Sequence, residues 1–208
     1  MKVALINENS QASKNEIIYN ALREVCDKKG FTVFNYGMYS DEDKNSITYV
    51  QAGILAAILL NSKAVDFVVT GCGTGEGAML ALNAFPNVLC GHIVDPSDAY
   101  MFSQINNGNA IAIPFAKGFG WGAELNLKYI FEQLFAEEAG KGYPKERAVP
   151  EQRNKKILDD VKKITHTSFI DILQNLDREL LKGAISSERF KEYFFKNCKD
   201  DEIAKFLM

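Results

Sequence analysis

The chain has 208 residues, of which 47% are hydrophobic and 25% are charged, and its formal net charge is −3. This composition is typical of a soluble globular protein, and the length suggests one main domain with an appendage. The charge balance argues against nucleic acid as a partner, and no apolar run reaches the ~18–20 residues of a membrane span. We expect the N-terminal run Met1–Ile6 to enter a strand rather than to be a signal peptide.

The cysteines and histidines favour a reduced protein without a metal site. The cysteines are scattered and form no CxxC pair, a usage typical of a cytoplasmic protein. Neither histidine belongs to a cluster of possible zinc ligands. We therefore expect a cytoplasmic protein that binds no metal. The residues concerned are Cys26, Cys72, Cys90, Cys198, His92 and His166.

Short apolar runs alternate with helical patterns through the first two thirds of the chain. The expected strands are residues 3–7, 31–36, 64–70, 88–90 and 110–113. The expected helices are residues 14–29, 46–61, 77–83, 96–106 and 121–139. Continuous rather than alternating apolar strands indicate a parallel sheet covered on both faces. The pattern predicts an open, doubly wound α/β sheet of about five strands, Rossmann-like, whose ligands bind beyond the carboxyl ends of the strands.

From Gly140 a turn-rich connection leads into a lysine-rich, helical tail. We therefore expect an α/β domain over residues 1–140 and an α-helical C-terminal extension over residues 141–208. Four aromatic side chains in the extension are expected to pack on the first domain or on a neighbouring subunit. They are Phe190, Tyr193, Phe194 and Phe206. The expected extension helices are residues 151–164, 168–181 and 187–197, followed by a short closing turn.

The most informative segment runs from Phe67 to Gly77, with the sequence FVVTGCGTGEG. It predicts a buried strand, a tight glycine turn and a helix N-terminus, whose free N–H groups favour an anion or oxyanion. The turn carries a thiol (Cys72), a hydroxyl (Thr74) and a carboxylate (Glu76). A thiol beside a helix N-terminus is suited to act as a base or nucleophile, although a buried structural cysteine is a common alternative.

The glycine spacing excludes two common nucleotide-binding loops. No Lys-Ser or Lys-Thr pair follows the glycines, as a P-loop requires. Glycine recurs at every second position from Gly71 to Gly77, which is not the GxGxxG spacing of dinucleotide-binding proteins.

The chain resembles the family of type B ribose-5-phosphate isomerases and galactose-6-phosphate isomerases. The resemblance rests on Cys72-Gly73-Thr74-Gly75-x-Gly77, then Asp95-Pro96, then Gln104-x-Asn106-x-x-Asn109, and it runs from Met1 to about Arg153. It implies that Cys72 moves a proton between C1 and C2 of an open-chain sugar phosphate. It also implies that Thr74 and the amides of Gly73, Gly75 and Gly77 stabilise the cis-enediolate. No metal or organic cofactor is implied.

Two positions depart from the family pattern. Glu8 and Asn9 follow the first strand, where the family has an Asp-His pair that binds the sugar. They are expected to bind substrate, but an N-cap and turn role explains the same residues. Ile105 stands where the family has the histidine thought to open the sugar ring. Asn106, the next residue, is expected to contact the substrate.

Three cations match the phosphate-binding positions of the family. Arg147 and Arg153 lie after the last helix of the α/β domain, and Lys117 follows the fifth strand. The resemblance implies that they hold the phosphate group, with Lys117 acting as a point charge. Without the resemblance, each is most simply a solvated surface charge.

The sequence therefore predicts a sugar-phosphate aldose–ketose isomerase with Cys72 as its base. The resemblance implies a homodimer, or a dimer of dimers, whose active sites are shared between subunits. Because Ile105 and Asn9 replace two histidines, the alternative is a sugar-phosphate binding or sensing protein that has lost turnover. A nucleophilic role for Cys72 is disfavoured, since no histidine is visibly placed to activate it.

Overall fold

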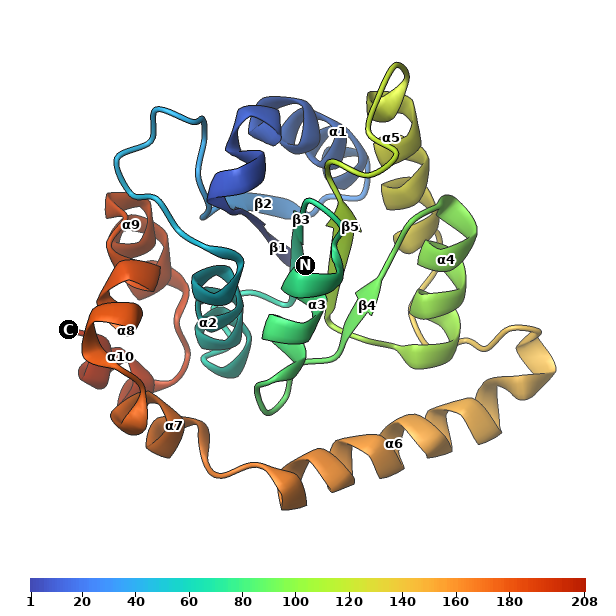
Figure 1. Ribbon diagram of the computed structural model, residues 1–208. Helices are drawn as coiled ribbons and strands as arrows, with labels where there is room; N and C mark the ends of the chain where they lie inside the picture. The colour runs from blue at the N-terminus through green and yellow to red at the C-terminus, as the bar shows by residue number, and fades with distance from the viewer.

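A five-stranded parallel sheet forms the centre of the protein, and the computed structural model describes all 208 residues (Figure 1). The strand order is β2-β1-β3-β5-β4. The strands are β1 (Lys2–Asn7), β2 (Thr32–Asn35), β3 (Phe67–Cys72), β4 (Cys90–His92) and β5 (Ala110–Pro114). This confirms the predicted doubly wound α/β fold.

Helices cover both faces of the sheet because alternate strand residues point to opposite sides. Leu5 and Val69 pack with α1, α4 and α5, whereas Ile6 and Val68 pack with α2 and α3. The helices are α1 (Asn15–Lys28), α2 (Tyr49–Asn61), α3 (Glu76–Asn83), α4 (Pro96–Met101) and α5 (Ala123–Leu134). A 3₁₀ segment (Asn9–Lys14) precedes α1, and a π-helical turn (Phe102–Asn106) continues α4.

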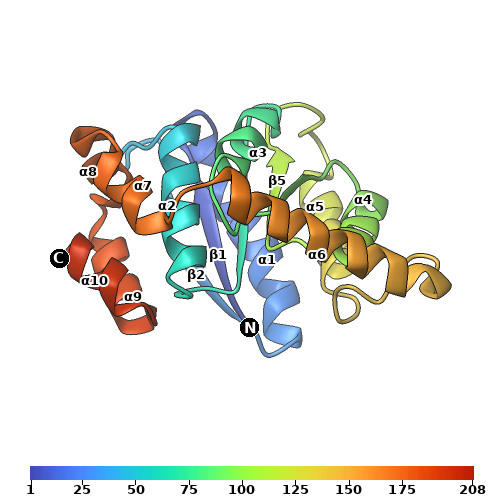
Figure 2. The ribbon, with the colours of Figure 1, turned by 90° about the horizontal axis from the view of Figure 1, so that it is seen from below.

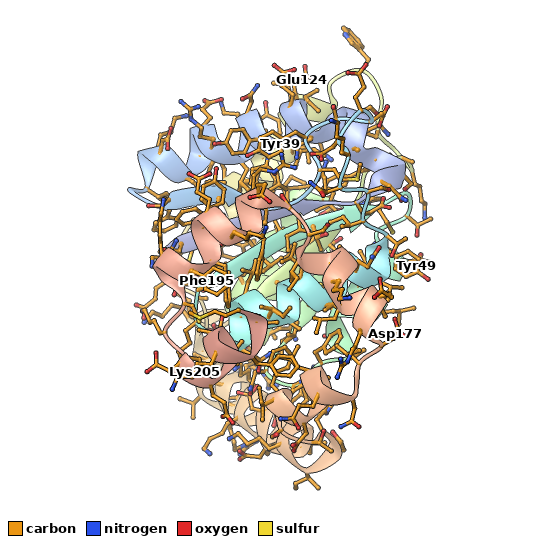
Figure 3. The ribbon with its side chains drawn as sticks, turned by 90° about the vertical axis from the view of Figure 1, so that its left-hand side faces the viewer. Tyr39, Tyr49, Glu124, Asp177, Phe195 and Lys205 are labelled. Carbon is orange, nitrogen blue, oxygen red and sulfur yellow. The ribbon has the colours of Figure 1, made fainter.

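Helix α2 is apolar on all sides. Its residues Ala52 to Leu60 are all buried, which requires cover on the face turned away from the sheet. The C-terminal helices provide this cover, as Figure 3 shows. Phe190 and Phe194, which are 1% and 0% exposed, join the same apolar cluster as Ile54 and Ile58 of α2. The expectation that these aromatic residues pack against the α/β part is therefore confirmed for Phe190 and Phe194, and Tyr193 packs against the same cluster. Phe206, in contrast, is 39% exposed and lies outside the cluster.

The C-terminal extension is entirely helical and its last segment is a helix, not the closing turn expected. Its helices are α6 (Ala148–Thr165), α7 (Phe169–Asn175), α8 (Arg178–Ile185), α9 (Glu188–Asn197) and α10 (Asp201–Leu207). The expectation of one helix over residues 168–181 is wrong. Asp177 accepts a hydrogen bond from Leu180 N at 2.8 Å and starts a new helix there. None of these helices combines the length and the apolar character needed to cross a membrane.

Helix α6 differs from the others because none of its residues is buried. It runs along the edge of the sheet where the strands begin, so that it lies below the sheet in Figure 1 and crosses the front of the view in Figure 2. The Lys162 ammonium donates to the carbonyl groups of Asn83, Phe85 and Val88, between α3 and β4. Burial there lowers the pKa of Lys162.

The aromatic cluster of α9 gives a stability prediction. Phe194→Ala should lower the free energy of unfolding by about 3–5 kcal/mol, because a buried phenyl ring is replaced by a cavity. The matched control is Phe195→Ala, whose ring is 36% exposed and meets Phe194 edge to face at 5.1 Å. It should cost about 1 kcal/mol. Urea unfolding of both variants measures the difference, and equal losses would show that the Phe194 ring is not part of the buried cluster.

Candidate active site

Some of the predicted site residues lie together at the edge of the sheet where the parallel strands end. Asn7 at the end of β1 pairs in register with Gly71 of β3, and Cys72 pairs with Pro114 of β5. Glu8, Cys72 and the loop after Pro114 therefore emerge side by side. Open α/β sheets bind their ligands at this edge.

The glycine turn after β3 forms a cradle of hydrogen-bond donors. Gly75 adopts a left-handed conformation (φ 80°) that turns the chain into α3. The N–H groups of Gly73, Thr74, Gly75 and Gly77 donate to no protein acceptor. The Thr74 hydroxyl accepts from Glu76 N at 3.3 Å and remains exposed. Four free amides beside a thiol match the geometry that stabilises a developing oxyanion.

The loop after β5 is fastened to this turn. Phe115 N donates to Cys72 O at 2.9 Å, and the amides of Ala116 and Lys117 both donate to Gly73 O at 3.0 Å. This arrangement places Lys117 next to the cradle. Its ammonium is exposed and has no ion-pair or hydrogen-bond partner in the protein. A free cation beside an oxyanion cradle is suited to bind an anionic substrate.

Cys72 is 8% exposed, and Gly77 lies between its side chain and the Tyr49 ring at the start of α2. A Cβ placed on Gly77 would lie 3.5 Å from that ring and 3.7 Å from Cys72 Sγ, so both side chains flank Gly77. Cys90, in contrast, lies at the opposite edge, and burial raises the pKa of its thiol. Burial also raises the pKa of Cys26 to about 12. Of these three thiols, only Cys72 adjoins the cradle.

Glu8 and Asn9 border the same edge. Glu8 is 2% exposed, and its carboxylate accepts from Ser10 N at 3.0 Å and from Ser10 Oγ at 2.6 Å. It therefore serves as the N-cap of the 3₁₀ segment in this structure. Asn9 is exposed, and its amide donates to Ser46 Oγ at 3.4 Å. The Asn9 side chain borders the open edge, whereas that of Glu8 is occupied locally.

Three residues of this edge escaped the sequence analysis. His92, at the end of β4, donates from Nε2 to Thr74 O at 2.8 Å and supports the glycine turn. The Lys14 ammonium donates to Phe115 O and to Gln11 Oε1, the latter at 2.8 Å. Tyr49 is the third. His92 could have been found as the polar residue that ends a strand, whereas Lys14 and Tyr49 reach the site only through the tertiary fold.

The other predicted site residues, Asn106, Arg147 and Arg153, lie at the opposite edge, where the strands begin. Asn106 precedes β5, and Arg147 and Arg153 belong to the segment that enters α6. Asn106 precedes the first residue of β5, Ala110, whereas Cys72 pairs with its last residue, Pro114. At ~3.3 Å per residue, the strand between them is about 13 Å long. No side chain spans that gap. Asn106, Arg147 and Arg153 are all exposed, and their side chains have no partner within the chain.

A cavity of about 460 Å³ lies beside Asn106, on the side away from Cys72. Gln152 of α6 donates to Ile105 O at 3.2 Å and accepts from Asn107 at 3.1 Å, which fixes α6 against the π-helical turn. The cavity is lined by Asn83, Leu89, Cys90, Phe102, Ile105, Asn106, Glu151, Asn154, Lys155 and Leu158.

The comparison with known families agrees with this geometry. A sequence profile of the family described as Ribose/Galactose Isomerase matches residues 3–147, more than half of the chain. The chain belongs to this family. A second profile, described as Ribose-5-phosphate isomerase, matches residues 164–208. Enzymes of the family are aldose–ketose isomerases, that is, intramolecular oxidoreductases, and the predicted enzyme class is confirmed.

Two solved structures match the whole chain, including the extension. One is a 4-deoxy-L-threo-5-hexosulose-uronate ketol-isomerase complexed with a tartrate, 63% identical with a TM-score of 0.98, covering 100% of this chain and 97% of that one. The other is a ribose-5-phosphate isomerase from Vibrio parahaemolyticus, 52% identical with a TM-score of 0.97 and the same coverage. A type B ribose 5-phosphate isomerase from Trypanosoma cruzi shares the fold, at 22% identity and a TM-score of 0.65, over 80% of this chain and all of that one. A search of curated protein sequences finds no match.

Proposed function

We propose that the protein interconverts an aldose and a ketose through a cis-enediolate, with Cys72 as the base. The observation that carries the proposal is the Cys72 thiol beside the four unpaired amides of the glycine turn. The thiolate takes the proton from C2, and the carbonyl oxygen at C1 becomes an oxyanion held by the amides of Gly73 to Gly77 and by the Thr74 hydroxyl. The thiol then returns the proton to C1, and the proton on O2 passes to O1. No atom is gained or lost.

The preferred substrate is an open-chain sugar acid. The uronate in the name of the 63% identical structure has carbonyl groups at C1 and C5 and no hydroxyl at C4. The hydroxyls that close the common sugar rings are therefore missing. Such a substrate needs no ring-opening step, which fits a site with Ile105 and Asn9 in place of histidines. The second candidate is a sugar phosphate, as the family and the 52% identical structure suggest. Both substrates carry the anion that Lys117, Arg147 and Arg153 would bind.

The complete site is proposed to form in a homodimer. The carboxyl edge of one subunit, with Cys72, would face the amino edge of the second, with Asn106, Arg147 and Arg153. Helix α6 supports this arrangement, because an exposed apolar stripe on a soluble protein marks a contact surface. The stripe consists of Ile157, Leu158, Val161 and Ile164, which are 54%, 48%, 46% and 83% exposed.

The role of the thiol gives the first test of function. Cys72→Ala should abolish isomerisation and solvent-deuterium exchange at C2, a loss of at least ~10²–10⁴-fold. Binding of the anionic substrate should persist, because the cations are intact. The matched control is Cys26→Ala, which removes a buried thiol of α1 away from both halves of the proposed site and should leave turnover within a few-fold. Full deuterium exchange in Cys72→Ala would refute the assignment. Tight binding without turnover in the unmodified protein would select the sensor instead.

The missing ring-opening histidine predicts a preference for open-chain substrates. A coupled assay over the hexosulose uronate, ribose 5-phosphate and galactose 6-phosphate should give the highest kcat/KM for the uronate. Ile105→His should raise turnover on the cyclised sugars and leave the uronate unchanged, because only cyclised sugars need a proton donor for opening. Equal efficiency of the unmodified protein on a cyclised sugar and a matched open-chain analogue would contradict this reading.

The shared site predicts complementation between two inactive variants. Cys72→Ala and Arg147→Ala lie in different halves of each proposed site, so a mixed dimer contains one intact site. Random exchange of subunits should restore about a quarter of the normal activity. Lys156→Ala, which breaks an exposed ion pair with Asp160 on the same helix, is the control and should not change KM. No recovery after verified subunit exchange would show that the site is not shared.

A further inference from the structure

The connection from Met38 to Thr48 forms one wall of the candidate active site. Met38 N donates to Asn7 O at 2.9 Å, and Asn9 N donates to Ile47 O at 2.8 Å. The connection ends in the capping box of α2, where Thr48 Oγ1 accepts from Gln51 N and the Gln51 side chain accepts from Thr48 N. Tyr49 follows at once and lies against Gly77 beside Cys72. The connection therefore leads directly into the residue whose ring lies beside Gly77.

Arg189 of α9 reaches this wall from the C-terminal extension. Its Nη2 donates to Gly37 O at 3.1 Å and forms an ion pair with Asp43. Its guanidinium carbon lies 3.9 Å from the centre of the Tyr39 ring, in cation–π contact. One side chain thus contacts Tyr39 and Asp43 of the connection and Gly37 just before it, although Asp43 is 146 residues away in the sequence.

The Asp43 carboxylate accepts several of the hydrogen bonds that order the connection. In addition to the bond from Arg189, it accepts from Tyr39 N and from Asn45 N, both at 3.2 Å. Burial alone would raise the pKa of Asp43, but the bonds from Arg189, Asn45 and Tyr39 outweigh it and lower that pKa. The carboxylate is therefore charged at neutral pH and available to Arg189.

The Arg189 pair differs from the other ion pairs of α8 and α9. Its side chains are 23% and 8% exposed, whereas Lys191–Glu188 and Lys182–Glu179 join neighbours on one helix and are at least 59% exposed. Exposed pairs of that kind contribute little. Docking of α9 also needs no guanidinium, because Phe190 and Phe194 already bury an apolar face. The Arg189–Asp43 pair instead joins two segments that are far apart in the sequence.

A second contact from the extension reaches the same place. Gly183 of α8 packs so closely on α2 that a Cβ there would lie 2.2 Å from Gln51 Nε2. Gln51 is the residue that closes the capping box with Thr48, directly before Tyr49. The extension therefore binds the middle of the connection through Arg189 and packs closely on Gln51, which caps α2 just after the connection ends.

We propose that Arg189 is a positioning residue of the active site: it holds the connection from Met38 to Thr48 so that Tyr49 stays packed on Gly77, whose other neighbour is the Cys72 thiol. The expected effect of Arg189 on turnover rests on the function proposed above, whereas its effect on the order of the connection does not. The extension is thereby a working part of the site rather than only a cover for α2.

The test compares Arg189→Met with Lys191→Ala, a control on the same helix, in the full-length protein. Arg189→Met should lower kcat/KM by between about 10- and 100-fold. It should also raise hydrogen exchange in the peptides of residues 38–49 and speed the alkylation of Cys72, assigned by mass spectrometry. Lys191→Ala should change none of these. Arg189→Lys, which keeps the charge but loses the planar fork, should lie in between.

Two further variants keep the test decisive. Asp43→Asn breaks the same ion pair from the side of the connection and should reproduce the rise in exchange, which covers the case that Arg189→Met does not fold. Tyr49→Ala should speed alkylation of Cys72 without raising exchange in residues 38–48. Unchanged exchange and alkylation in folded Arg189→Met and Asp43→Asn would overturn the proposal. If the unmodified protein turns over no sugar, the proposed function fails, while exchange and alkylation still decide the role of Arg189.

Discussion

The close contact between the end of β3 and β5 is the constraint on which the candidate site depends. A Cβ on Gly71 would lie 2.2 Å from Ile113 O and 2.5 Å from the Phe115 ring, so only glycine fits there. This contact brings Cys72 into register with Pro114, after which the next amides of the β5 loop bond back to Cys72 O and Gly73 O. The turn is thereby held from outside, and its own amides are left free for a ligand. A cradle that needs no rearrangement during the reaction is the form in which oxyanion stabilisation is most effective.

A parallel sheet also divides the functional residues. All strands end at one edge and begin at the other, so residues that follow a strand cannot meet residues that precede one within the same chain. Cys72 and Lys117 are of the first kind, and Asn106 is of the second. Helix α6, which carries Arg153 and follows Arg147 directly, extends the amino edge with its apolar stripe exposed. In the proposed dimer, the separation becomes useful, because binding of the anion and abstraction of the proton are then contributed by different subunits. Activity would depend on subunit association, and dilution below the dimer dissociation constant would abolish it.

Local signals in the sequence were sufficient for the fold and for the glycine turn. An apolar β-branched run, alternating glycines and a helical run follow each other directly between Phe67 and Asn83. Each of these patterns determines the backbone conformation of the residues that carry it. Helical periodicity, which locates most helix boundaries in a sequence, concealed the boundary between α7 and α8. Apolar residues continue at helical spacing across Leu173, Leu176 and Leu180, and this periodicity masked the N-cap signal of Asp177. Both helices cover the same cluster, so the periodicity survives the break in the backbone.

Tyr49 and Arg189 lie beyond the reach of such signals. Tyr49 is separated from Cys72 by the whole of α2 and β3, and Arg189 meets Asp43 across 146 residues. Arg189 stands in an amphipathic helix, where sequence alone suggests a solvated charge. Its contact with the wall exists only because α9 docks beside β2, where Tyr193 meets the rings of Phe34 and Tyr36 at 5.5 and 5.6 Å.

The same dependence explains why removing the extension would be a poor test of its role. Helix α2 is apolar around its whole circumference, with nine consecutive buried residues, and the extension covers the face that the sheet does not. A truncated chain would expose that face and lose stability, solubility and the position of Tyr49 together. Cover and positioning are separable only at single residues. Phe194 contributes apolar contact and no bond to the wall, whereas Arg189 contributes bonds to the wall and little to the apolar cluster. Stability should therefore follow Phe194, and the order of the wall should follow Arg189.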